Sequence, residues 1–556
     1  MIIFYNGKVY SDGEMKSALV TEGKKIVYVG DDETAKAMAA GAKSDVRMVD
    51  LNGRLMLPGF VDSHAHPGYT AKMFEDKISL SECSTKEEIL QEIKDFVEQN
   101  PDIDFYEGAG WMAPVFGEAG PAKEWLDEIC PDKPMVLTGL EGHSLWANSK
   151  AIEKAGITDE TPQPDGGVIE KNEDGTVRGV FKEEAMKPVH AICPEPSVEA
   201  IKKGIRNYQK LMVEAGYTAS TEMMFCKNDE IYQAYMELAE AGELIMKVGM
   251  SNLITPAKPG AEYLKDYANP DRKIYNRAIH DYYIKIFMDG VVEGHTAWLK
   301  EPYADDPNYC GDPIWNHDDL FELALGLDKM GYNFHMHAIG DRAAQEVADL
   351  AEYLQKNNPR DDRICVLAHA QLIKPDDIQR LADLGVTLST DPCWFGFEKA
   401  YHEGLEIPFL GEERADSMYP MKTLFDAGIV VSAASDFNIT PYPHPLFSAL
   451  TGSQRAFIDE NFQPDEVYRP EERVTIPQMI QALTTNGYYS IGIADTAGKL
   501  LEGMDADLVV LSDNVLEFED ALKLLDVSVD MTVSEGDVVY EGGLTLKDAL
   551  NKYVFA

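Results

Sequence analysis

Residues 58–67 read Pro-Gly-Phe-Val-Asp-Ser-His-Ala-His-Pro, and the fold prediction starts from this stretch. The apolar pair Phe60 and Val61 is typical of a short buried strand, and two histidines follow it at 64 and 66. Residues two apart in a strand point to the same side, so the imidazoles of His64 and His66 can face one ion. Alone this is a weak signal, because most such pairs are unrelated polar residues.

Beyond this stretch, short apolar strands alternate with longer amphipathic segments, which is typical of parallel βα units. Eight strands are predicted, and they fit a (β/α)8 TIM barrel of the α/β class. We place them at 61–64, 135–139, 218–223, 282–288, 332–337, 364–369, 386–389 and 429–435. More than 150 residues separate the first strand from the third, which is too long for one βα unit. We therefore expect an insertion at about 70–200.

Both ends of the chain are rich in β-forming residues. Residues 1–6, 18–21 and 25–29 form short apolar runs between turns, and residues 506–511, 528–534 and 538–540 repeat that character. The pattern indicates one small β domain assembled from both termini, with two unrelated β caps as the alternative.

Composition restricts the partners. The 556 residues carry a formal net charge of −46, a field that repels phosphate backbones and anionic lipids. We expect a small-molecule substrate, no nucleic acid and no membrane partner, and the prediction allows a homodimer. The sequence shows no secretory signal and no apolar run of membrane-spanning length, and its seven cysteines are scattered without paired spacing. These features predict a cytoplasmic protein.

Residues that commonly bind metals also follow later predicted strands. Lys285 lies within an apolar strand, where a free ammonium group is costly, and His337 and His369 end the fifth and sixth strands. Asp436 ends the eighth. Each of these is more often structural by itself, but their arrival in this order favours a metal site. Histidine nitrogen and carboxylate oxygen suit zinc, manganese, iron or nickel.

This order of residues resembles the amidohydrolase superfamily, and most closely its amidohydrolase family 3 branch of formamide-deformylase-like metal hydrolases. The matching segments are PGFVDSHAHP (58–67), GHSLWANSKAI (142–152), IKIFMDGVVEGHTA (284–297), HAIGDRAAQ (337–345), AHAQLIKPDDIQR (368–380), SDFNITPYPHPL (435–446) and GKLLEGMDADLVVL (498–511). The resemblance covers nearly the whole chain. It implies a β-sandwich of residues 1–57 and 491–556 on a metal-hydrolase barrel of residues 58–490.

The resemblance also implies the ligand set. His64, His66 and Asp436 would hold the more buried ion, and His337 and His369 the second. The expected cofactor is one or two divalent ions, with zinc as the first choice.

Lys285 takes the position of a carboxylated lysine, whose CO2-derived carbamate bridges two ions in related hydrolases. The alternative is a snorkelling or salt-bridged lysine. Two departures from the family pattern bear on the ligand set. His335 lies two residues before His337 and could compete for the same ion, and Ala368 replaces a common glutamate.

Further candidates come from segments near the predicted barrel mouth. His143 or His295 is a candidate to stabilise an oxyanion. Candidates for substrate binding are Trp111, Trp146, Glu222, Asp289 and Arg342. Each has a structural alternative: tryptophan is usually core, Glu222 is equally well a salt-bridged acid at a strand end, and His143 a turn residue.

The preferred function is hydrolysis of an amide-type C–N bond in an N-acyl, N-formyl or cyclic amide. The ion would lower the pKa of a water, and Asp436 would act as general base and then as general acid. Deamination and ester or lactone hydrolysis use the same chemistry and stay open. A metal-binding regulatory protein with vestigial activity is the alternative outside enzymes.

Overall fold

A computed structural model of the protein describes residues 1–42, 45–70, 77–80, 83–116, 120–139, 144–164, 167–194, 196–225, 229–268, 270, 274–292, 294–396, 399–440 and 442–554. The chain forms two compact units, one of Met1–Ala71 with Ile201–Ala556 and one of Lys72–Ala200. We call them the main unit and the inserted unit. Among the described helices, none is long and apolar enough to cross a bilayer. The cytoplasmic location stays a prediction.

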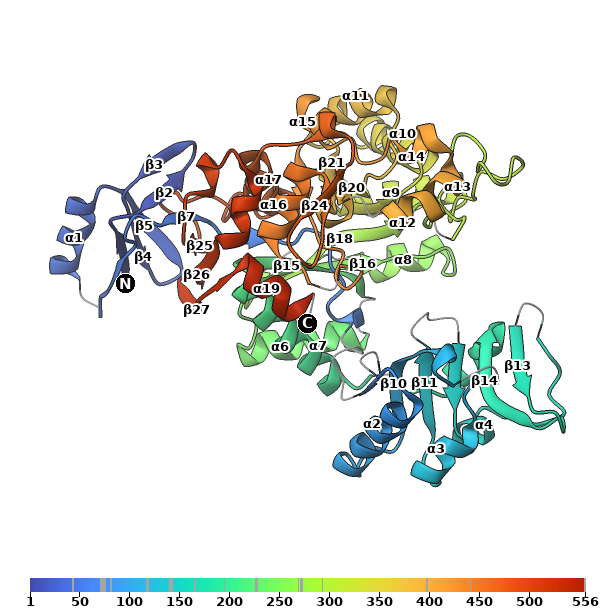
Figure 1. The fold of residues 1–556 in the computed structure, drawn as a ribbon. Coiled ribbons are helices and arrows are strands. Elements are labelled where there is room, and N and C mark those ends of the chain that lie inside the picture. Colours follow the sequence, from blue (N-terminus) through green and yellow to red (C-terminus); the bar gives the residue numbers. More distant parts are fainter. Residues whose placement is uncertain are drawn as a thin grey trace. The chain divides into compact units, whose positions relative to one another are not determined.

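In the main unit, strands from both chain ends form two facing sheets, drawn in blue and red in Figure 1. The first sheet has the order β5 (Lys25–Gly30), β4 (Ala18–Glu22), β1 (Ile2–Tyr5) and β6 (Arg47–Asp50). The second has the order β27 (Asp537–Thr545), β26 (Ser528–Ser534), β25 (Leu508–Leu511), β7 (Leu55–Pro58), β2 (Lys8–Ser11) and β3 (Glu14–Lys16).

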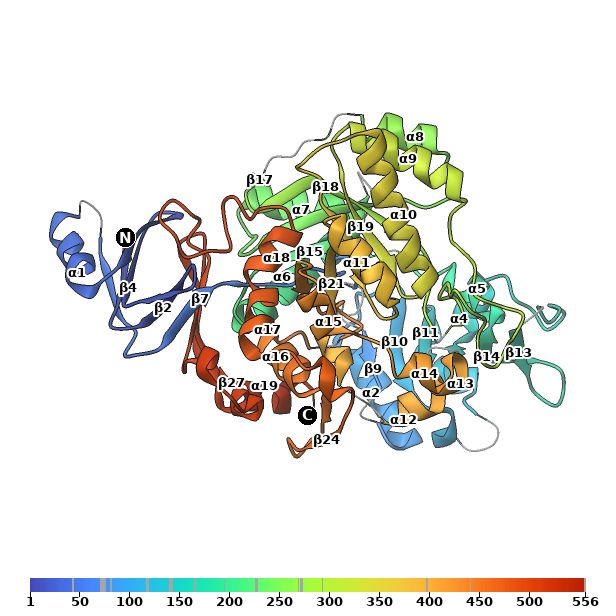
Figure 2. The ribbon, with the colours of Figure 1, turned by 90° about the horizontal axis from the view of Figure 1, so that it is seen from above.

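The apolar faces of the two sheets share one core. Phe4 and Leu19 of the first sheet pack in the same buried cluster as Met56, Val510 and Met531 of the second. In Figure 2 the blue N-terminal strands and the red C-terminal strands again lie side by side, and β7 pairs antiparallel with β25. The prediction of a β-sandwich built from both termini is confirmed. The N-terminal and C-terminal segments that supply these strands also contain one helix each, α1 (Asp32–Gly41) and α19 (Leu546–Tyr553).

The barrel is a parallel sheet of eight strands in one path. Its strands are β8 (Phe60–Val61), β15 (Tyr217–Phe225), β16 (Lys247–Leu253), β18 (Ala278–Phe287), β19 (Asn333–Ala338), β20 (Cys365–His369), β21 (Thr387–Thr390) and β22 (Val431–Ala433). The first and last strands meet through Ser63, whose N–H donates to the Ala433 carbonyl at 3.3 Å, and through a bridge between Ala65 and Phe437. The nearly closed sheet confirms the TIM barrel.

Helices follow most barrel strands, as a βα architecture requires. They are α6 (Val198–Glu214), α7 (Glu230–Ala241), α8 (Gly260–Asp266), α9 (His317–Lys329), α10 (Asp341–Asn357), α11 (Pro375–Asp383), α15 (Met421–Asp426), α16 (Pro445–Gln454), α17 (Ile476–Leu483) and α18 (Thr485–Ser490). Polar side chains cap the N-termini of several of these helices. At the start of α9, for example, the Asn316 side chain accepts hydrogen bonds from the N–H groups of Asp318 and Asp319. Several short elements lie between the larger ones. β17 (Ile274–Tyr275) precedes β18; α12 (Lys399–Tyr401), α13 (Ile407–Leu410) and α14 (Glu412–Ala415) follow β21; and β23 (Ala456–Ile458) and β24 (Pro464–Val467) follow α16.

One predicted barrel strand is wrong. Residues 135–139 form β11 (Met135–Gly139) of the inserted unit, and the second and third barrel strands are β15 and β16. Sequence reasoning missed β16 because Lys247, Ser251 and Asn252 interrupt its apolar pattern, although all three side chains are buried. Polar residues in a buried strand remove the periodicity on which strand prediction depends.

The inserted unit has its own sheet and core. The sheet has the order β13 (Gly167–Lys171), β14 (Val177–Glu183), β12 (Ser144–Ala147), β11, β10 (Tyr106–Trp111) and β9 (Ile78–Ser79). Its helices are α2 (Lys86–Gln99), α3 (Lys123–Ile129), α4 (Ser149–Lys154) and α5 (Lys187–His190). Two apolar clusters fill this unit, so residues 72–200 have a hydrophobic core of their own.

A buried lysine joins the barrel to the sandwich. Lys247, the first residue of β16, forms an ion pair with Asp507 and lies 3.3 Å from Asp505 and 3.5 Å from Glu535. Burial would lower the pKa of Lys247, but the three carboxylates raise it above its usual value. Because Lys247 and Asp507 are both fully buried, either charge without the other is strongly unfavourable.

We predict that Lys247→Met lowers the free energy of unfolding in urea by about 3–5 kcal/mol, since the buried carboxylates lose their counter-charge. The double variant Lys247→Met/Asp507→Asn should recover part of that loss. Lys499→Met, which breaks the exposed pair with Asp12, is the matched control and should cost less than about 1 kcal/mol. Equal losses in the two single variants would contradict the account.

Candidate metal centre

Three side chains that commonly bind metals converge at the carboxyl ends of β8 and β22. His64, His66 and Asp436 each offer one ligand atom, and these atoms lie within 4.8 Å of one another. Asp436 Oδ1 is 2.9 Å from His66 Nε2 and 3.5 Å from His64 Nε2. Donors at the corners of a tetrahedron around zinc are about 3.3 Å apart when the bonds are about 2.0–2.1 Å. The observed spacings are close to that value.

Backbone contacts between the first and last strands fix this arrangement. Asp436 N–H donates to the His64 carbonyl at 2.9 Å, and His66 N–H donates to the Phe437 carbonyl at 2.9 Å. Buried Asp62 accepts from both the N–H and the hydroxyl of Ser435. The ligand-bearing ends of β8 and β22 are therefore held together by their own main chains.

Lys285 and His335 contact opposite nitrogens of the His64 ring. Lys285 Nζ lies 3.0 Å from His64 Nε2, and His335 Nε2 lies 2.7 Å from His64 Nδ1. With a hydrogen on Nδ1 directed at His335, the lone pair of Nε2 is left for an ion. In that tautomer His335 would hold the His64 ring in place, and its competition with His337 for an ion stays a prediction.

His337 and His369 form a second pair beside the first group. Their ring centroids are 4.6 Å apart, and the centroid of His369 is 4.9 Å from that of His64. His369 Nδ1 lies 2.8 Å from Asp391 Oδ2, and the ring of Trp394 stacks on His369 at 5.5 Å and 8°. Asp391 and Trp394 were not singled out in the sequence, although Asp391 lies only two residues beyond the predicted strand 386–389.

The electrostatics favour neutral ligands. Burial, reinforced by the charge of Lys285, lowers the pKa of His64 well below its usual value, and burial does the same for His337. Burial lowers the pKa of Lys285 to about 7, although Asp436 and Asp391 oppose the shift. Burial alone would raise the pKa of Asp436, but His66, His369 and Lys285 hold it below its usual value. Neutral imidazoles beside an ionised carboxylate are the protonation states that metal ligation requires.

A divalent ion fits this group of residues. His66 Nδ1 is buried and makes no hydrogen bond with any described residue, and Asp436 Oδ1, also buried, lies 2.9 Å from His66 Nε2. A buried carboxylate among neutral imidazoles is unfavourable unless a cation contacts it. Asp436, His337 and His369 also line a cavity of about 620 Å³, so a small molecule can reach them.

Asp289 and Glu222 were predicted to bind substrate, and that role stays a prediction; in the structure both carboxyl groups accept hydrogen bonds from loop N–H groups. Asp289 is fully buried and accepts from the N–H groups of Trp298, Ile339 and Gly340 at 2.8, 3.1 and 2.8 Å. Burial raises its pKa to about 7 against those three donors. Asp289 thereby fixes the loops after β18 and β19. Its Oδ1 lies 3.7 Å from His337 Nε2.

Glu222 lies on β15, the second barrel strand rather than the predicted third. Its carboxyl group is fully buried and accepts from Gly68 N–H, from Met224 N–H at 3.3 Å and from the Tyr235 hydroxyl at 3.2 Å. Burial raises the pKa of Glu222 to about 8. The contact with Gly68 holds the loop that follows His66.

Arg342 and His295 point to other partners. Arg342 Nη2 lies 2.9 Å from Glu346 Oε2, and its guanidinium stacks 4.6 Å from the Trp298 ring. His295 Nε2 lies 3.2 Å from Asp305 Oδ2. Neither Arg342 nor His295 lines the cavity described above. His143 falls in 140–143, outside the described residues. Its role stays a prediction, as does that of His295.

Trp111 and Trp146 lie in the core of the inserted unit. Both are buried in one apolar cluster with ring centroids 6.3 Å apart, and Trp111 Nε1 donates to the Leu137 carbonyl. Within that unit they pack against other side chains, which is the structural alternative considered for tryptophan. Their contact with substrate stays a prediction.

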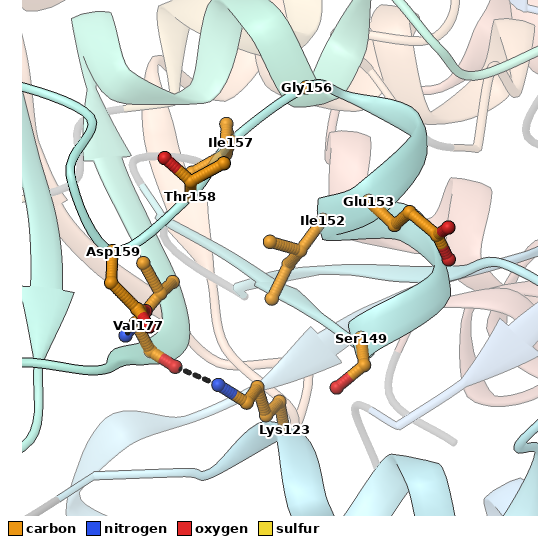
Figure 3. Close-up of a pocket in the computed structure, with 9 residues that line it drawn as sticks. All are labelled: Lys123, Ser149, Ile152, Glu153, Gly156, Ile157, Thr158, Asp159 and Val177. Carbon is orange, nitrogen blue, oxygen red and sulfur yellow. Dashed lines mark hydrogen bonds between the residues drawn. The ribbon is translucent and has the colours of Figure 1, made fainter.

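The inserted unit also has a cavity of about 260 Å³, shown in Figure 3. Its polar groups already have partners: Lys123 Nζ donates to the Val177 carbonyl, and Asp159 Oδ1 accepts from Val177 N–H. Ser149 donates to Asp127. Its lining contains no histidine or cysteine, so it is a poor candidate for the metal centre.

The amidohydrolase family model matches residues 47–540. The chain belongs to this family. The Bacillus subtilis protein YtcJ, named as an amidohydrolase, is 30% identical over 97% of this chain and 99% of its own length. The N-substituted formamide deformylase of Arthrobacter pascens is 24% identical over 94% of this chain and 95% of its own.

A solved structure agrees in fold. An uncharacterized metal-dependent hydrolase from Pyrococcus horikoshii superposes with a TM-score of 0.75 at 24% identity, covering 93% of this chain and 98% of its own. With the family established, the chain is a metal-dependent hydrolase that acts on carbon–nitrogen bonds. The contacts described above identify a group of residues suited to a divalent ion.

Asp391 provides a test of the second histidine pair. We predict that Asp391→Asn weakens metal retention about 10–100-fold, because His369 loses the carboxylate that orients it. Zinc remaining after competition with a chelator measures the effect. Asp376→Asn, on the exposed face of α11, is the matched control. Unchanged zinc retention in Asp391→Asn would contradict the positioning role.

Proposed function

We propose that the protein hydrolyses an amide-type C–N bond in an N-acyl, N-formyl or cyclic amide. The observation that carries the proposal is the convergence of His64 Nε2, His66 Nε2 and Asp436 Oδ1, with Asp436 facing a substrate-sized cavity. In the proposed site His64, His66 and Asp436 hold one ion, while His337 and His369 hold a second. The family and the name of the formamide deformylase support this reaction class.

We propose zinc as the ion. Histidine nitrogens and a carboxylate are the ligands of catalytic zinc sites, and the spacings around Asp436 Oδ1 suit its bond lengths. When bound, such an ion lowers the pKa of a water and polarises the scissile carbonyl.

Lys285 is proposed to carry a carbamate. Its Nζ would add to CO2 and lose a proton, which changes a cationic side chain into an anionic one. Only the neutral amine reacts in this way, and a pKa of about 7 leaves a large neutral fraction above neutral pH. Full burial next to His64 supports the proposal, because an anion there balances cations better than an ammonium group does.

Asp436 is proposed as the proton carrier. Asp436 lines the cavity, so its carboxylate is within reach of a water there and its Oδ1 can accept a proton from that water. The same oxygen can then deliver that proton to the departing nitrogen, so the leaving group departs as a neutral amine. His66, 2.9 Å away, helps to keep Asp436 ionised before the reaction.

We predict that Asp436→Asn retains part of its zinc but loses about 10²–10⁴-fold in kcat, because the amide cannot accept the proton. Turnover of N-formyl amines measured together with zinc content separates the two effects. Near-native kcat in this variant would refute the general-base assignment.

Lys285→Ala distinguishes a binuclear site from a mononuclear one. We expect zinc content to fall from about two ions per chain to about one or none, with a large loss of turnover, because the bridging ligand is gone. A short carboxylic acid added to this variant should restore part of the activity by filling the bridge position. Unchanged zinc content and turnover would make Lys285 a structural residue.

A further inference from the structure

The cavity in front of the candidate metal centre has an unusual chemical lining. Besides Asp436, His337 and His369, most of its walls are apolar or aromatic. Among the apolar and aromatic lining residues are Val291, Ile339, Trp394, Met418, Ile439 and Phe457. The described lining residues include no lysine and no arginine.

Two arginines lie close to the wall, but they are engaged elsewhere. Arg455 has no accessible surface, and its guanidinium donates to the Tyr419 and Tyr468 carbonyls at 2.9 and 3.3 Å. Arg469 donates to the Ser417 and Met418 carbonyls at 2.8 and 2.7 Å. Arg455 Nη2 makes no hydrogen bond with the described residues, but neither arginine is in the lining, so neither can contact a ligand in the cavity directly.

The charged groups that do line the cavity are acidic. Glu406, on the π-helical turn His402–Glu406, lies 2.7 Å from His402 Nδ1, and Asp416 lies 3.2 Å from His402 Nε2. The acid–imidazole–acid arrangement places two carboxylates around one ring. His402 is already paired with these two carboxylates, so an anionic substituent beside Glu406 would meet a carboxylate and no lysine or arginine of the described lining, in a protein of net charge −46.

Apart from these polar residues, the cavity wall consists largely of aromatic and aliphatic side chains. Trp394 is held by its stacking on His369 and by the hydrogen bond from its Nε1 to Thr440 Oγ1 at 3.2 Å. At the opening, Ile439 is 67% exposed and Phe457 is 40% exposed, although both are apolar. Exposed apolar side chains around a binding cavity favour an apolar ligand.

We propose that the substrate is an amide with an apolar, preferably aromatic, substituent and no anionic group, so that amides of amino acids with a free carboxylate are rejected. The proposal rests on the proposed amide hydrolysis and names its substrate class. An apolar substituent buries surface against Trp394, Ile439 and Phe457, whereas a carboxylate there would lose water without gaining a partner.

The test compares two amides that differ only in a carboxylate, N-formyl-2-phenylethylamine and N-formylphenylalanine, with the corresponding N-acetyl pair, on zinc-loaded full-length protein. We expect kcat/KM to be higher for the uncharged member of a pair by about 100-fold or more. Values within about threefold of each other would overturn the substrate class but leave the amide hydrolysis intact. If neither member of either pair is hydrolysed, the proposed function itself fails.

A gain-of-function variant tests the cause of the discrimination. Phe457→Lys places a cation on the lining, and Met48→Lys places one at an equally exposed position on β6 of the sandwich. Phe457→Lys should improve kcat/KM for N-formylphenylalanine relative to the uncharged amide about tenfold, less so at high salt, whereas Met48→Lys should not. An unchanged ratio in Phe457→Lys would contradict the role assigned to charge.

Discussion

The site depends on the contact between the first and last strands of the barrel. β8 is only two residues long, and the residues that follow it pair with the chain after β22: Asp436 N–H donates to the His64 carbonyl, and Ala65 bridges Phe437. Buried Asp62 reinforces the contact by accepting from Ser435. These bonds close the barrel and also bring two histidines and a carboxylate from distant parts of the sequence to one point.

Burial then determines the protonation of the ligands. Because the imidazoles lie in the barrel interior, their pKa values fall and their nitrogen lone pairs become available. Hydrogen-bonding partners of the proposed ligands would set which nitrogen faces an ion: His335 contacts His64 Nδ1, and Asp391 contacts His369 Nδ1. Buried carboxylates at Asp289 and Glu222 perform a different task, since they tie loop N–H groups in place next to the ligands.

The repeating part of the fold could be predicted from the sequence, because most barrel strands are apolar runs that end in a histidine or an acid. The order of His64, His66, Lys285, His337, His369 and Asp436 was sufficient to propose a metal site. Strand β16 could not be found, because buried Lys247 and Asn252 break its apolar pattern. Lys247 is buried because it pairs with Asp507, 260 residues later in the chain. The burial of Asp289 and Glu222 could not be predicted either. An acidic residue at a strand end has the same sequence signal whether it faces a substrate or a backbone N–H. The cavity wall combines residues from 291 to 468, and only the folded chain shows that none of its described members is basic.

Anomalous diffraction at the zinc edge, from crystals of the zinc-loaded protein, tests the central claim most directly. We expect an anomalous peak about 2.0–2.2 Å from His64 Nε2, His66 Nε2 and a carboxylate oxygen of Asp436, and a second peak beside His337 and His369. Zinc found only elsewhere, with no peak at His64, His66 and Asp436 in a protein that is catalytically active, would contradict it.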